Sequence, residues 1–119
     1  MSAPDLLNTT LNFYIADVST AGQIYVPIPT GFDGVVVEIR TALNGAITGA
    51  DATLTPKVGG TAMTSGAITI TQSGSAAGDV DTSSPTSSNA VRVGEAVEIE
   101  TDGGSTGTIE VFGTLVIRR

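Results

Sequence analysis

Hydrophobic and polar residues alternate with a period of two along several short stretches of the chain. In the segment EAVEIET, Val97 and Ile99 fall on one face and Glu98 and Glu100 fall on the other. The same alternation recurs in the segments GAITITQ and GTIEVFGTLVIRR. This period is typical of antiparallel strands with one buried face. We find no stretch with the 3.6-residue period of an amphipathic helix.

The alternating runs, and the turn signals between them, predict nine short strands. They are expected at 10–17, 23–28, 34–43, 51–58, 61–64, 66–72, 89–93, 95–101 and 107–117. Strands of this length and spacing predict an all-β, single-domain antiparallel β-sandwich, which we expect to be jelly-roll-like. An immunoglobulin-like sandwich is the alternative, because the order of strands in a sheet cannot be read from a pattern. Pro27, Pro29 and Pro56 fall in or beside these runs, which favours sheet edges or bulges there.

The segment GSAAGDVDTSSPTSSN, residues 74–89, interrupts this pattern. It contains one large apolar side chain, Val80, and two close aspartates, Asp79 and Asp81. Asp79, Asp81 and Ser83 have the alternating spacing of a calcium loop, but the glycine and glutamate of an EF-hand are missing at the sixth and twelfth positions. The composition is also that of a disordered linker. With strand patterns on both sides, we predict a long surface loop whose turns the two aspartates cap.

Two other segments are candidates for contacts with another molecule. The first, residues 1–9, is expected to be an N-terminal arm preceding a sandwich domain at 10–119. Its two leucines either tuck against their own core or pack on another subunit. The second, IYVPIP at 24–29, has apolar residues at consecutive positions, which predicts a central strand or an oligomer interface. The candidate interface residues are Pro4, Leu6, Leu7, Ile24, Tyr25, Val26 and Ile28.

Composition limits the chemistry of the chain. It has no histidine and no cysteine, so the commonest general base and nucleophile are missing. Glu98 and Glu100 share one strand face, which indicates a solvated surface rather than a catalytic pair. We therefore predict that the chain is not an enzyme and that it needs no metal or cofactor.

The charge and the hydropathy pattern limit the kinds of molecule that the chain is expected to bind. The formal net charge is −7 on 119 residues, which disfavours binding to nucleic acid or to an anionic membrane. No apolar run reaches the roughly 18 residues needed to span a bilayer. The N-terminus lacks the basic and apolar regions of a signal peptide, so we expect synthesis in a cytoplasm.

Four segments resemble the decoration, or cement, proteins of tailed-bacteriophage heads. They are IADVSTAGQIYVPIP, LNGAITGADATLT, GAITITQSGSAAGDVD and VGEAVEIETDGGSTGT, and together they span roughly residues 14–117. The resemblance implies a β-sandwich or jelly roll that binds the outer surface of an icosahedral head and bridges neighbouring capsomers. It implies the major capsid protein as partner, a homotrimer as the usual assembly, and the virion as the location. It supplies no catalytic or interface residues.

A carbohydrate- or host-surface-binding module, such as a head-fibre tip or small lectin, is the alternative function. Sandwiches of this kind support sugar binding, but a fold does not imply a function. The chain has two tyrosines, three phenylalanines and no tryptophan. That low aromatic content argues against a sugar site.

Overall fold

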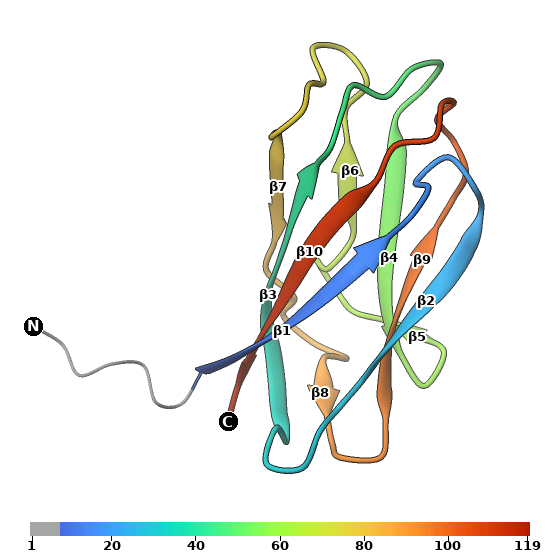
Figure 1. Cartoon of the computed structure of the whole chain (residues 1–119). Coiled ribbons are helices and arrows are strands. Elements are labelled where there is room, and N and C mark those ends of the chain that lie inside the picture. The colour runs from blue at the N-terminus through green and yellow to red at the C-terminus, as the bar shows by residue number, and fades with distance from the viewer. Residues whose placement is uncertain (1–7) are drawn as a thin grey trace, which may run out of the picture.

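The computed structural model describes residues 8–119 and places ten strands in two antiparallel sheets, with no helix in that range (Figure 1). Sheet A contains β1 (Asn8–Ile15), β3 (Gly34–Leu43), β7 (Val80–Ser83), β8 (Ala90–Val91) and β10 (Val111–Arg118). Sheet B contains β2 (Gly22–Pro27), β4 (Ala52–Val58), β5 (Thr61–Ala62), β6 (Ile68–Ile70) and β9 (Ala96–Thr101). The predicted β-sandwich is confirmed, but its first strand begins at Asn8, so Asn8 and Thr9 belong to the domain and not to the expected arm 1–9. The arm is therefore residues 1–7.

The strand order is that of a jelly roll. Antiparallel pairs are nested along the sequence: β1 pairs with β10, β2 with β9, β3 with β7 and β8, and β4 with β5 and β6. Successive pairs alternate between the sheets, so that sheet A reads β1-β10-β3-β7 and sheet B reads β2-β9-β4-β5. Nested pairs that alternate in this way form the two Greek keys of a jelly roll, which excludes the immunoglobulin-like order.

The core lies between the two sheets and is built from the alternation seen in the sequence. Val97 and Ile99 are buried, whereas Glu98 and Glu100 lie on the outer face of sheet B. Glu100 pairs there with Lys57 at 3.2 Å. The last strand likewise turns apolar side chains inward, and the buried ones are Val111, Leu115 and Ile117.

The segment 74–89 is not one continuous surface loop, which corrects the prediction. Val80–Ser83 forms β7, which pairs with Ile39–Ala42 of β3 at the edge of sheet A. Because β3 offers a free row of backbone donors and acceptors, even a polar tetrapeptide can satisfy its main chain by pairing there. The part of the prediction that concerns Asp79 is confirmed: its Oδ2 accepts a hydrogen bond from Ala76 N at 2.9 Å.

Pro27 lies at a sheet edge, as expected, whereas Pro56 does not. Pro27 ends β2, an edge strand of sheet B. Pro56, however, lies in β4, which has neighbours on both sides. Its carbonyl accepts a hydrogen bond from Met63 N at 2.9 Å, so its nitrogen faces the gap between β5 and β6. Pro56 is tolerated inside the sheet because no ladder bond is needed at that gap.

Candidate functional site

The outer face of sheet A carries an apolar row that crosses four strands. The row consists of Tyr14, Phe112, Ala42 and Val80, each paired in register with the next. Tyr14 is 46% exposed, Phe112 49% and Val80 54%. We call these four residues the apolar ladder. Since the outward positions of a solvated sheet are usually polar, aligned apolar side chains indicate a surface that binds something.

The two aromatic members of the ladder hold each other in place. The rings of Tyr14 and Phe112 lie 5.2 Å apart between centroids and are tilted by 44°. The Tyr14 hydroxyl donates a hydrogen bond to Glu110, and this bond is the largest cause of the raised pKa of Tyr14. Asn44 Nδ2 donates to the other Glu110 oxygen at 2.8 Å. The aromatic end of the ladder is therefore held by contacts within the chain itself.

A second row, made of polar side chains, runs beside the ladder. Asn12, Thr114, Arg40 and Thr82 lie two residues further along the same four strands and are again in register. Two residues along a strand correspond to about 7 Å. Arg40 Nε donates to Glu38 at 3.1 Å. Within residues 8–119, the side chains of Asn12, Thr114 and Thr82 have no hydrogen-bond partner. We call these four residues the polar row.

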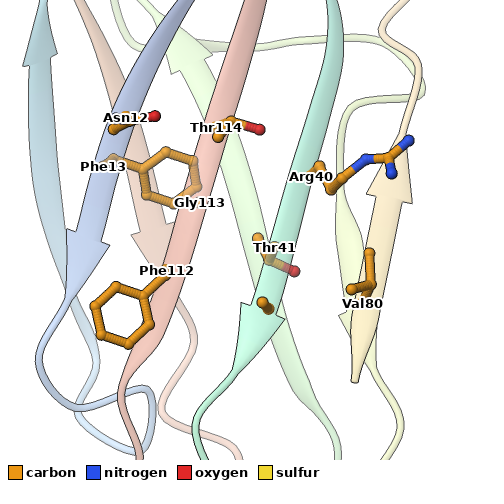
Figure 2. Close-up of a pocket in the computed structure, with 9 residues that line it drawn as sticks. Asn12, Phe13, Arg40, Thr41, Val80, Phe112, Gly113 and Thr114 are labelled. Carbon is orange, nitrogen blue, oxygen red and sulfur yellow. The ribbon is translucent and has the colours of Figure 1, made fainter. Parts of the chain in front are cut away.

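The two rows enclose a shallow depression of about 390 Å³ (Figure 2). Its apolar side is formed by Phe112, Ala42 and Val80, and its polar side by Asn12, Arg40 and Thr114. Gly113 and Phe13 lie beneath it, with the Phe13 ring directed over the glycine backbone (Figure 2). The result is a hollow with an apolar half and a hydrogen-bonding half.

The aspartates of the segment 74–89 do not form a metal centre. Burial is the first cause of the raised pKa of Asp81, and the nearby Asp79 is the second. A calcium loop would instead bring several oxygen ligands together around the ion. Among residues 8–119, no group of three or more acidic, histidine or cysteine side chains is placed to hold a metal.

The seven candidate interface residues differ in burial and in whether the structure describes them. Pro4, Leu6 and Leu7 lie outside the described residues. Val26 and Ile28 are 6% and 4% exposed and belong to the core, and Ile24 is half-buried against it. The expectation of a central strand at 24–29 is wrong, because β2 lies at the edge of sheet B. Val26 and Ile28 are also not interface residues, because they turn into the core of their own domain.

Tyr25 is the exception in that strand. It is 63% exposed on the outer face of sheet B and pairs in register with Glu98. Of the four candidate residues at 24–28, Tyr25 is the one that is exposed.

Sequence reasoning did not find the apolar ladder. Each member occupies an outward position in its own strand, and a single exposed hydrophobic residue needs no explanation. The signals were the aromatic residues Tyr14 and Phe112, at positions where the alternation expects polar ones, and Val80, the one large apolar side chain of its segment. Their alignment depends on the register of four strands, which the sequence does not state.

Comparisons with known proteins assign no family to the chain. No family model matches it, and no curated protein matches it. Among solved structures, it is similar to a chain from Bacillus endospore appendages, described as a novel family of disulfide-linked pili. The identity is 11% over 99% of this chain and 96% of that chain, with a TM-score of 0.27. A similarity at this TM-score carries no argument about fold or function.

One structural finding concerns membranes. In the part of the chain that the structure describes, no helix is long and apolar enough to cross a bilayer.

Proposed function

We propose that the chain is a structural virion protein that binds the outer surface of an icosahedral phage head. In this role it stabilises the shell by bridging neighbouring capsomers, with the major capsid protein as its partner and a homotrimer as its assembly. The observation that carries the proposal is the resemblance of four segments across residues 14–117 to phage decoration proteins. The resemblance implies a β-sandwich or jelly roll, and the chain folds as a jelly roll.

The charge of the chain is compatible with this position. A protein outside the shell does not meet the packaged DNA, so a net charge of −7 is no obstacle to its function. Each contact with the shell can be weak, because linked subunits gain avidity through their high effective concentration.

The arm and Tyr25 are the candidate contacts with the shell or with a neighbouring subunit. The described chain begins with β1, where Asn8 pairs with Arg118 near the C-terminus (Figure 1). Both ends of the domain therefore lie at the same end of the sandwich. An arm that extends from this end can reach a partner without disturbing either sheet.

Quantitative gel densitometry of purified virus particles tests the proposal. The band of this chain is scaled to the band of the major capsid protein. We expect a fixed, simple ratio, as for a protein that occupies equivalent positions over the whole shell. Absence from the particle, or only a few copies in each particle, would contradict the proposal and indicate a tail or fibre component instead.

A further inference from the structure

We propose that the apolar ladder and the polar row together bind a pyranose oligosaccharide on the outer face of sheet A. The site combines an exposed aromatic pair, an adjacent line of hydrogen-bonding side chains and the depression between them. This inference does not rest on the proposed virion function, because it concerns a different face and can be measured on the isolated chain.

The low aromatic content of the chain argues against a sugar site, but two of its few aromatic residues, Tyr14 and Phe112, lie together here. The apolar half of the site therefore suits the C–H face of a sugar ring. Phe112 is 49% exposed, and its ring is supported by Tyr14 at 5.2 Å. Aromatic rings offer large apolar contact areas at fixed positions. Val80, which is 54% exposed, extends this surface on the far side of Ala42. A pyranose ring lying across the ladder would remove apolar area from water on both partners.

The polar half of the site suits the hydroxyl edge of the same ring. The Asn12 amide can donate and accept hydrogen bonds, and the Thr114 hydroxyl can do the same. Neither side chain has a hydrogen-bond partner among residues 8–119, so both are available to a ligand. Arg40 uses only its Nε toward Glu38, which leaves the terminal guanidinium nitrogens as donors. Since these groups lie about 7 Å from the ladder, one sugar unit can contact both rows.

The dimensions of the site favour a small ligand over a protein partner. The ladder spans three strand spacings, or about 14 Å. A stable protein interface buries roughly 800 Å² on each partner, which is more than such a short row offers. The depression of about 390 Å³ lies within the range of roughly 300 to 1,000 Å³ that small-molecule sites occupy.

The position of the site leaves it open when the other end of the molecule is engaged. Asn8 and Tyr14 lie at opposite ends of β1, six residues or about 20 Å apart. A partner that binds the end where β1 begins would therefore not cover the ladder. Sugar binding and attachment to a shell can occur on the same molecule.

The experiment is a screen of the full-length protein on a printed array of neutral and uronic-acid oligosaccharides. The strongest binder is then titrated against the wild type and four variants by calorimetry. Phe112→Ala removes the aromatic platform, Asn12→Ala removes a polar contact, and Arg40→Gln removes the cation. Tyr25→Ala is the matched control, because it removes an exposed aromatic side chain from the other sheet. Thermal unfolding checks that each variant is folded.

We expect Phe112→Ala to weaken binding by about tenfold or more, which corresponds to the loss of one good contact. Asn12→Ala should weaken it to a lesser extent, and Tyr25→Ala should leave it unchanged. If the ligand is acidic, Arg40→Gln should lower its affinity more than that of a neutral sugar. Should Phe112→Ala fail to fold, Asn12→Ala still tests the sugar site. The exposed Asn12 side chain makes no hydrogen bond in the described structure, so its removal should not disturb the fold.

Two results would overturn the inference. One is the absence of binding to every oligosaccharide on the array, which would favour a protein as the occupant of this face. The other is binding that Tyr25→Ala abolishes and the sheet A variants leave intact. The particle densitometry is independent of both results, so either proposal can fail while the other stands.

Discussion

Gly113 is the residue around which the packing of sheet A is arranged. It faces inward in β10, in register with Phe13 of β1. A Cβ atom at position 113 would lie 2.0 Å from Cζ of Phe13, so the aromatic ring occupies the space that a side chain would need. Phe13 is 7% exposed and compensates for the small strand residue with its own volume.

We predict that Gly113→Ala destabilises the protein, because the added methyl group forces Phe13 out of its position. Overpacking of this kind costs about 1 to 3 kcal/mol of unfolding free energy. Urea unfolding of the variant and the wild type measures the difference. The double variant Phe13→Leu/Gly113→Ala should lose less than the sum of the two single changes. An unchanged unfolding free energy for Gly113→Ala would contradict the packing described here.

Part of this arrangement could be predicted at the level of single residues. The alternation in GTIEVFGTLVIRR indicates which face of the last strand is buried, and it puts Gly113 on that face. It does not indicate that Phe13 fills the gap, because the two residues are a hundred positions apart and meet only through strand pairing.

Among the connections between elements, the one after β9 begins with a carboxylate that accepts two backbone hydrogen bonds. β9 belongs to sheet B and β10 to sheet A, so the chain crosses between the sheets after Thr101. Asp102 Oδ1 accepts hydrogen bonds from Thr53 N at 3.1 Å and from Gly104 N at 3.0 Å. The bond from Thr53 is the largest cause of the lowered pKa of Asp102.

We predict that Asp102→Ala lowers the unfolding free energy at neutral pH by about 0.5 to 1.5 kcal/mol, the net contribution of a typical intramolecular hydrogen bond. The pKa of Asp102 in the folded chain lies below its ordinary value of 3.8. The Asp102 carboxylate therefore contributes fully to the unfolding free energy above that value. This contribution is lost as the pH falls through the lowered pKa. The difference between variant and wild type should shrink in that acidic range. Asp102→Asn, which keeps an acceptor oxygen, should lose less, and a pH-independent difference would contradict the assignment.

The segment 74–89 shows where element prediction from sequence stops. Its composition indicates a loop, and most of its residues are exposed. Yet Gly78 N donates to Leu43 O at 2.7 Å, and Thr86 N donates to Thr64 O at 2.9 Å. The segment is held by this backbone pairing and by side-chain hydrogen bonds such as that from Asn89 Nδ2 to Val36 O at 2.7 Å. Both depend on where the sheet edges lie, which the composition of the segment does not indicate.

On the scale of the whole molecule, the candidate contacts lie in three places, of which Tyr25 on the outer face of sheet B is one. The arm precedes β1 at the end of the sandwich near Arg118, and the apolar ladder lies toward the far end of the same strand. We propose attachment to the shell through the arm and Tyr25, and sugar binding through the apolar ladder and the polar row.

We predict that deletion of residues 1–7 weakens binding to phage heads and leaves the fold intact. The deletion stops before Asn8, so every pair between β1 and β10 is preserved. Co-sedimentation with heads that lack this chain measures binding, and thermal unfolding checks the fold. Unchanged binding would refute the role of the arm, and a large loss of thermal stability would show that the arm packs on its own domain.

The sequence by itself determined the β class, the buried face of its clearest strands and the limits set by charge and composition. These follow from local periodicity and from counting residues, which need no knowledge of the partners of a strand. The tertiary structure decided the strand order, the formation of β7 and the burial of Val26 and Ile28. It also decided the apolar ladder, because Tyr14, Phe112, Ala42 and Val80 come from four strands far apart in the chain. Only the register between strands, a long-range property, turns isolated exposed residues into one surface.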